Sequence, residues 1–188
     1  VSAGLEGRGR QRLLAAEALQ DIAGLQLENR PNEFEKGRHE PLYRQAIEIS
    51  EDAAGKNSPE AGYAWKRLGT YFGSTRSEYA KGEEALEKAL KIQQSCLYEN
   101  SPLLADTLGG LAGCKHFMGK KEEALQLAFR ANDMHEIYSP PGSSHSGGGE
   151  LAFHLRMCGR QKEAEYYQKR GNFGHHQTLP YPPKYKLE

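Results

Sequence analysis

The chain has 188 residues, of which 37 % are hydrophobic, and its 25 lysine and arginine residues balance 25 aspartate and glutamate residues. This balance argues against a general nucleic-acid or anionic-membrane binder, because such proteins carry a basic excess or a basic stripe. The mean hydropathy of −0.78 is low for a compact globule. It suits an elongated repeat protein, whose surface is large relative to its core.

Targeting signals and cysteine content indicate the cellular compartment in which the protein is expected. No segment approaches the ~20 apolar residues of a membrane span, and no signal-peptide pattern is present, so we expect no membrane insertion. The start at Val1 indicates a processed or shortened form. Cys96, Cys114 and Cys158 are odd in number and widely spaced, unlike a disulfide framework. We therefore expect a reducing compartment inside the cell, the cytoplasm first and an organelle interior as the alternative.

Residues 8–29 form the first predicted helix, which Pro31 and Asn32 end. Its apolar stripe consists of Leu14, Ala18, Ile22 and Leu25. We expect residues 1–36 to be a leading helix or cap followed by an irregular linker. The nearby arginines, Arg8, Arg10 and Arg12, offer an alternative reading as the remnant of an organelle-targeting segment, which Glu6 and Glu17 weaken.

Three ten-residue segments are near copies of one another: EPLYRQAIEI (40–49), EEALEKALKI (83–92) and EEALQLAFRA (122–131). Ala46, Ala89 and Ala131 lie 43 and 42 residues apart, and a weaker copy, KEAEYYQKRG, brings Gly171 a further 40 residues on. A period of this size is typical of a solenoid. Small or apolar residues recur at i, i+4 and i+7 in each of the three segments, which predicts helices.

A second kind of helix is predicted at 59–73 and 102–119, and each follows an Asn-Ser-Pro triplet. Ser58 and Ser101 are the expected N-caps, and a proline takes the first helical position, where no amide donor is missed. One unit is therefore helix A, a short turn and helix B. Because a single hairpin cannot bury its own apolar face, the units must stack.

Trp65, Leu68, Gly69 and Phe72 resemble the tetratricopeptide signature W-x2-L-G-x2-Y. Further matches are Leu111, Ala112, Ala124 and Ala131. The period of 42 and the phrase EPLYRQAIEI make the chain similar to the kinesin light chain type of this repeat. The resemblance covers about 37–170 and implies an all-α, right-handed superhelix, or α-solenoid, of about eight antiparallel helices in three to four hairpins. It implies a helix B near 37–54, repeats near 59–98, 102–138 and 147–170, and a tail at 171–188.

Two features depart from that family. Cargo-binding light chains carry Asn on the inner face of helix A, where the register here gives Arg67, Gly110 and Glu150, so an Asn clamp on a peptide backbone is not supported. SPPGSSHSGGGE (139–150) stands at the start of the third A helix, and glycines inside a helix cost roughly 1 kcal/mol each. We expect a flexible loop there, a helix shortened to about 150–158, and candidate phosphorylation at Ser143, Ser144 or Ser146.

The inner face of helix A is the expected partner-binding groove, because helix A lines the concave surface in this repeat. Its candidate residues are Tyr63, Lys66, Arg67, Thr70, Asp106, Gly109, Gly113, His116, Phe153 and Arg156. The glycines either leave a shallow floor for an extended peptide or partner helix, or simply permit close helix packing. The positive residues Lys66, Arg67 and Arg156 indicate an acidic ligand, although Asp106 and Glu150 dilute the charge.

The tail cannot be a regular helix, because Pro180, Pro182 and Pro183 favour extended polyproline geometry. It is either a disordered end or an arm that docks on a partner, or back on the solenoid, through Tyr181 and Tyr185.

The residues that bear chemistry form no convincing reactive set. His154 and Cys158 are i, i+4 on one helix, but structural zinc needs four ligands at tight spacing. Cys114 and His116 point about 200° apart on a helix and cannot act together. GCKHFMGKK (113–121) departs from the phosphate-loop spacing. We predict no enzyme activity, cofactor, metal or small-molecule substrate.

The sequence thus favours a scaffold or adaptor that binds a peptide or partner subunit through the groove or the tail. Two alternatives stay open: a structural subunit of a larger, organellar complex, and a metal-dependent site in the C-terminal third, which carries most of the histidines.

Overall fold

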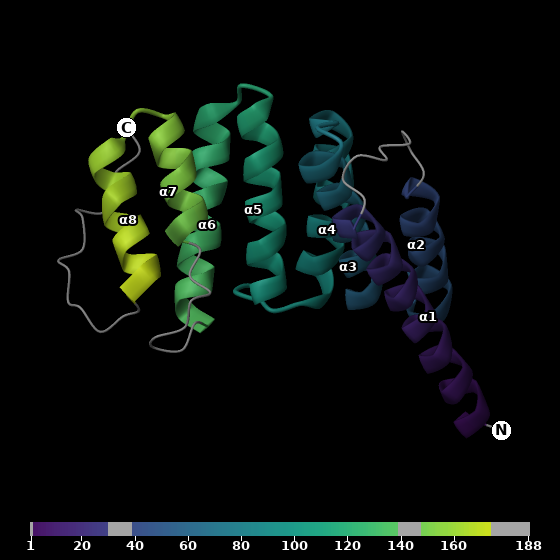
Figure 1. The fold of residues 1–188 in the computed structure, drawn as a ribbon. Helices are drawn as coiled ribbons and strands as arrows, with labels where there is room; N and C mark the ends of the chain where they lie inside the picture. The colour runs from purple at the N-terminus through teal and green to yellow at the C-terminus, as the bar shows by residue number, and fades with distance from the viewer. Residues whose placement is uncertain (1, 30–38, 139–147, 174–188) are drawn as a thin grey trace. The chain divides into compact units, whose positions relative to one another are not determined.

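The computed structural model describes residues 2–29, 39–138 and 148–173 (Figure 1). Over this part of the chain it is all-helical, which confirms the predicted fold class and the expectation of about eight helices. The elements are α1 (Ser2–Asn29), α2 (Glu40–Ala54), α3 (Pro59–Thr70), the π-helical turn η1 (Tyr71–Thr75), α4 (Tyr79–Cys96), α5 (Pro102–Phe117), α6 (Lys121–Tyr138), α7 (Gly148–Met157) and α8 (Gln161–Phe173). Residues 139–147 of the predicted loop at 139–150 lie outside the described residues, and so do residues 174–188 of the predicted tail at 171–188, with Tyr181 and Tyr185. Residues 171–173 belong to α8.

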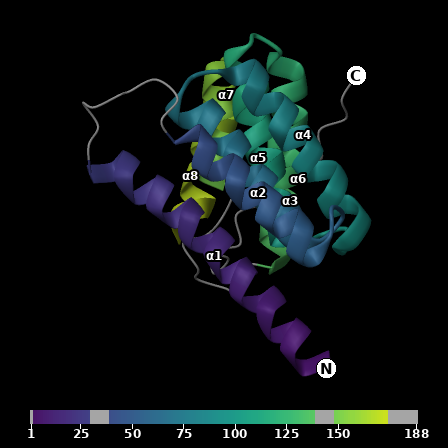
Figure 2. The same ribbon diagram turned by 90° about the vertical axis from the view of Figure 1, so that its right-hand side faces the viewer.

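The chain divides into two compact units, Val1–Glu99 and Asn100–Glu188. In the first unit α1 pairs with α2 and α3 with α4, while α2 also packs on α3. In the second unit α5 pairs with α6 and α7 with α8, while α6 packs on α7. Figures 1 and 2 show the antiparallel course of the hairpins within each unit. The B helices α2, α4 and α6 end at residues 54, 96 and 138, in steps of 42 residues.

Small residues of the repeated segments lie at the helix interfaces. Ala46, Ala89 and Ala131 are buried, and so are Ala85 and Ala124. A methyl side chain lets a neighbouring helix approach closely, so the repetition seen in the sequence is a repetition of helix contacts.

The tetratricopeptide signature in α3 has a direct structural cause. The Trp65 indole N–H donates to a Glu51 carboxylate oxygen at 3.0 Å, and the Lys88 ammonium lies 3.6 Å from the Trp65 ring centroid. A Cβ on Gly69 would lie 2.5 Å from Leu86 Cγ and 3.0 Å from the Leu86 backbone nitrogen. Glycine is therefore required where α3 crosses α4.

Aromatic side chains fill the core of the first unit. Tyr43, Tyr71 and Phe72 are buried beside Leu68, with ring centroids 5.1 Å apart for the two tyrosines. Burial raises the pKa of Tyr43 and Tyr71 above the ordinary value, because a phenolate would be poorly solvated there. Both hydroxyls therefore stay protonated at neutral pH.

The predicted helix at 59–73 does not continue as a regular helix. It ends at Thr70 and widens into η1, whose extra residue per turn lets the adjacent Tyr71 and Phe72 both reach the core. The chain then reverses through Ser77, which has a positive φ of 54°.

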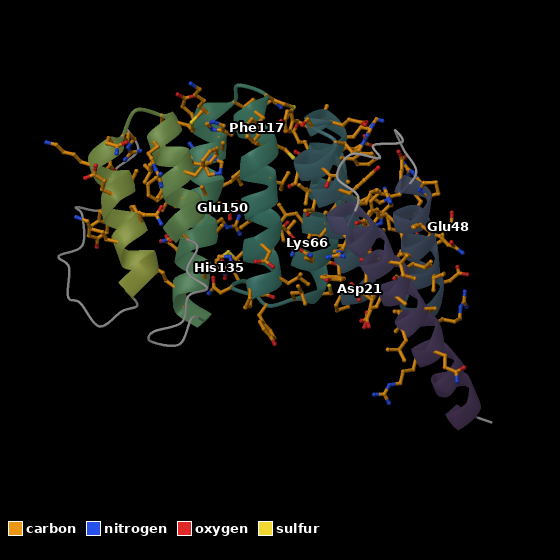
Figure 3. All side chains as sticks on the ribbon, in the orientation of Figure 1. Asp21, Glu48, Lys66, Phe117, His135 and Glu150 are labelled. Carbon is orange, nitrogen blue, oxygen red and sulfur yellow. The ribbon has the colours of Figure 1, made fainter. Side chains whose placement is uncertain are left out.

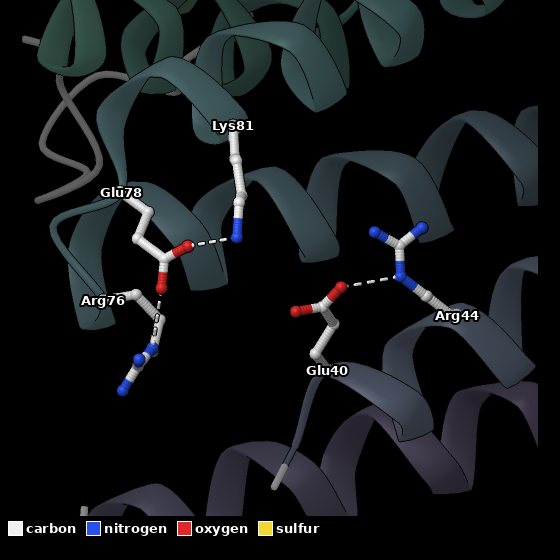
Figure 4. A network of polar contacts seen from close by, with 5 residues as sticks. All are labelled: Glu40, Arg44, Arg76, Glu78 and Lys81. Atoms are coloured by element: carbon white, nitrogen blue, oxygen red, sulfur yellow. Dashed lines mark hydrogen bonds and ion pairs between the residues drawn. The ribbon is translucent and has the colours of Figure 1, made fainter. Parts of the chain in front are cut away.

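A group of partly exposed ion pairs surrounds this reversal (Figure 4). Glu78 pairs with Arg76 at 3.2 Å and with Lys81 at 2.5 Å, and Glu40 pairs with Arg44 at 2.7 Å. The hydrogen bond from Lys81 lowers the pKa of Glu78, so its carboxylate stays ionised. Exposed pairs of this kind contribute little to stability, so we assign them to loop geometry.

The two expected serine caps differ. The Ser58 hydroxyl oxygen accepts from the Ala61 backbone N–H at 3.1 Å, as predicted. Ser101 stands at the N-cap position of α5, as predicted, but its side chain makes no cap hydrogen bond.

The predicted stripe on the first helix does not face the core. Leu14 and Ile22 are 58 % and 46 % exposed, whereas Ala16 and Ala23 on the opposite side are buried. The small side chains face the hairpin because α1 packs closely on α2, as the other hairpins do. Leu14 and Ile22 therefore point outward, and the N-terminal end of α1 extends past the end of α2 (Figures 1 and 2).

The third A helix is short, as predicted, but it begins earlier. α7 covers Gly148–Met157, so Gly148 and Gly149 lie in its first turn. Terminal residues make few intrahelical hydrogen bonds, so the glycines cost less there than in a helix interior.

The paired serines predict a difference in stability. Ser58→Ala should lower the free energy of unfolding by about 1 kcal/mol, because it leaves the Ala61 N–H without its partner. Ser101→Ala should cost clearly less. Urea unfolding of both variants checks this, and equal losses would contradict the difference in capping.

Two glycines make a second matched pair. Gly69→Ala should destabilise the chain by about 1–3 kcal/mol, because the new methyl group collides with Leu86. Gly113→Ala meets no atom within 4 Å and should stabilise its helix by up to about 1 kcal/mol. Thermal unfolding gives both values, and a neutral Gly69→Ala would refute the close crossing of α3 and α4.

Candidate functional site: an aromatic and histidine cluster on α5 and α7

Two phenylalanines lie together on the surface of the second unit. Phe117 ends α5 and Phe153 lies in the middle of α7, and their side chains are 55 % and 39 % exposed. Their ring centroids are 6.4 Å apart. Met157, one helical turn after Phe153, is 48 % exposed and extends the same apolar surface. Figure 3 labels Phe117 at the C-terminal end of α5.

Two buried histidines support the phenylalanines. His116 and His154 are 5 % and 1 % exposed, and their ring centroids are 5.2 Å apart. His116 contacts Phe117 and Phe153, each at 5.6 Å between centroids, and Phe153 contacts His154 at 5.3 Å. We call these four residues, His116, Phe117, Phe153 and His154, the ring cluster.

The ring cluster is uncharged at neutral pH. Burial lowers the pKa of His154 to about 4, and the nearby His116 lowers it further in the same direction. Burial also lowers the pKa of His116, with a smaller contribution from Lys121. The Nδ1 atoms of both histidines are buried, and neither has a hydrogen-bond partner among the described residues. Such a surface suits apolar, aromatic or proline side chains better than an acidic ligand.

Of the two glycines predicted to form the floor of the groove, Gly109 and Gly113, only Gly113 has open space beside it. A Cβ on Gly113, one turn before Phe117, would meet no atom of the described residues within 4 Å, so these residues leave space beside the ring cluster. A Cβ on Gly109 would meet the Glu150 carboxylate at 2.7 Å. Gly109 therefore makes room for a side chain of α7, and the expected floor is filled there.

The remaining predicted residues of the second unit make contacts within the chain. Asp106 lies 3.5 Å from a ring nitrogen of His135. Arg156 donates to Gln168 at 2.7 Å and to the Ala152 carbonyl oxygen at 3.3 Å. The structure therefore brings His116 and Phe153 together, while Arg156 is engaged elsewhere.

The predicted residues of the first unit lie along α3, and Figure 3 labels one of them, Lys66. The Lys66 ammonium lies 5.9 Å from the Tyr63 ring centroid, and the Thr70 hydroxyl donates to the Lys66 carbonyl oxygen at 3.0 Å.

Arg67 fastens α3 to α1, because it donates to the Gln20 carbonyl oxygen at 3.1 Å and lies 3.7 Å from Asp21. Arg67 and Arg156, two of the three cations from which an acidic ligand was predicted, are thus engaged in contacts within the chain.

Phe117, His154 and Met157 were not among the predicted groove residues. The dipeptide His116-Phe117 and the run Phe153-His154 were the available signal, since each places one ring inward and one outward on its helix. Register from the sequence selected only one ring of each pair.

Within the described ranges, no group of three or more His, Cys, Asp or Glu side chains could hold a metal ion. Burial raises the pKa of the Cys96 thiol, which opposes its activation as a nucleophile. Among the helices described, none is both long and apolar enough to cross a membrane.

Known structures share this fold, although no protein-family model and no curated protein sequence matches the chain. BtubC (BKLC) from P. vanneervenii superposes with a TM-score of 0.64 at 17 % identity, over 83 % of this chain and 63 % of that one. A Podosopora anserina protein with nearly identical kinesin-light-chain TPR-like repeats gives 0.57 at 16 % identity, over 90 % and 92 %.

A point variant of the same Podosopora anserina protein gives 0.62 at 17 % identity, over 88 % and 74 %. The chain thus has a TPR-like repeat fold, and it spans less than two thirds of the BtubC chain.

The ring cluster predicts a pH dependence of stability. The pKa of His154 is about 4 in the fold against an ordinary 6.5, so the unfolded chain binds a proton that the folded chain refuses between those values. The free energy of unfolding should be highest above pH 6.5 and should fall, by on the order of 3 kcal/mol, as the pH drops to 4. His154→Phe should lose this part of the slope. An unchanged slope in unfolding measurements of the variant from pH 7 to 4 would contradict it.

Proposed function

We propose that the chain is a non-enzymatic scaffold whose ring cluster binds a partner protein through an apolar segment. TPR-like repeats generally serve as protein-interaction scaffolds, because stacked hairpins present long continuous surfaces. The fold thus supports the general role, and the surface of the second unit supports the specific one.

The observation that carries the proposal is the pairing of Phe117 with Phe153 on the surface. Single exposed apolar residues are ordinary, but neighbouring large ones mark binding sites more often. Here two rings and the Met157 side chain are exposed on α5 and α7. Aromatic side chains dominate the binding energy of interfaces, because each removes a large apolar area from water at a small entropic cost.

The chemistry of the cluster defines the ligand class. The histidines beneath the phenylalanines are neutral and packed, so a ligand of the ring cluster would contact uncharged rings. Open space beside Gly113 gives an extended segment room to pass. We therefore propose a short segment with a proline, aromatic or aliphatic anchor, in place of the acidic peptide expected from the sequence.

The outward face of α1 favours a second candidate, a subunit of a larger complex. Leu14 and Ile22 are exposed at i and i+8 on one side of the helix, where a further helix could pack. A complex that depended on this face would be lost in Leu14→Glu with Ile22→Glu and retained in a variant of the ring cluster.

Selection from a displayed peptide library tests the first proposal. The full chain should select segments whose dissociation constant rises roughly tenfold or more in Phe117→Ala with Phe153→Ala, since removing an aromatic anchor costs about 2 kcal/mol.

Ile137→Ala is the matched control, because Ile137 is also exposed, at 62 %, in the same unit. It should bind the selected segments as the unchanged chain does. Equal binding by all three proteins, or no selectable segment, would refute the site.

A further inference from the structure

We propose that, without a partner, the chain's own residues 179–185, Leu-Pro-Tyr-Pro-Pro-Lys-Tyr, occupy the ring cluster. This inference rests on the proposed function, since it names one occupant of the same site. It concerns a segment of the second unit, which also contains α5 and α7.

The chemistry of the segment matches that of the cluster. Prolines hold a chain in the polyproline conformation, which loses little entropy on binding and docks on surfaces lined by aromatic side chains. Pro180, Pro182 and Pro183 alternate with Tyr181, so the segment offers flat apolar rings. Phe117 and Phe153 present exposed rings 6.4 Å apart at their centroids, above histidines that are neutral.

The residues that follow α8 are numerous enough for this segment to reach the ring cluster. α8 has 13 residues and runs antiparallel to α7, so Phe173 lies at the end of the hairpin where α7 begins (Figure 1). Returning along α8 requires about 20 Å at 1.5 Å per residue. In extended polyproline geometry about six residues cover that length at 3.1 Å each. Residues 174–179 are long enough for this span, which would bring Pro180 near the end of α7 that carries Met157.

Tethering favours this occupant over a free peptide. A short flexible connection gives a linked segment an effective concentration in the millimolar range. A segment that binds only weakly in solution would therefore fill the site within its own chain.

Photo-crosslinking in the full chain tests the contact. A photoreactive benzoyl-phenylalanine at position 117 keeps the shape of Phe117 and should crosslink to residues 179–185 of the same molecule. The same probe at position 137, which is no less exposed, should not. Crosslinking of both positions to the segment in equal yield, or of neither, would overturn the inference.

A binding measurement separates this inference from the proposed function. A labelled peptide of residues 178–186 is added to the unchanged chain and to a full-length variant with Tyr181→Ser, Pro182→Ser and Pro183→Ser. The variant should bind the peptide roughly tenfold more tightly, because its own segment no longer competes. Adding Phe117→Ala and Phe153→Ala should abolish that gain.

Equal affinities for the two chains would overturn the self-occupied state. If the ring cluster still discriminates among library-selected segments, the proposed function survives that result. If neither the peptide nor any library segment depends on Phe117 and Phe153, both ideas fail together.

Discussion

Close helix packing through small side chains is the constraint on which the structure depends. Ala46, Ala89 and Ala131 recur because the B helices can approach their neighbours only where a methyl group faces the contact. Gly69 carries the same requirement further, since even a methyl group there would collide with Leu86. On α1 the same preference is visible, since Ala16 and Ala23 are buried whereas Leu14 and Ile22 are exposed.

The fold could be predicted from the sequence because its signals are local and repeated. The Asn-Ser-Pro triplets fix helix starts, and the recurring alanines fix a period, so neither depends on distant contacts. Ser101 shows the limit of such reasoning, since its position at the N-cap was right but its hydrogen bond is absent. The π-helical turn could not be predicted either, because it follows from burying Tyr71 and Phe72 together in a three-dimensional core.

The site was harder to predict, because of two side chains assigned to the same face, one can be engaged within the chain while the other stays exposed. Arg67 and Phe153 were both placed in the groove by register. Arg67 turns to a carbonyl oxygen of α1, while Phe153 stays exposed beside Phe117. Only tertiary contacts decide which charged side chains are engaged within the chain and which rings stay exposed. The proposal of an apolar ligand rests on these contacts and on the neutral histidines beneath the rings.

The central claim is that Phe117, Phe153 and Met157 form a surface that a partner covers. The most direct measurement is the ¹³C-methyl spectrum of the chain's three methionines during titration with a library-selected segment. The account predicts that the exposed Met157 signal shifts with ligand, while the signal of Met134, which is buried, stays in place. A selected segment that binds without moving the Met157 signal, or that moves both signals alike, would contradict it.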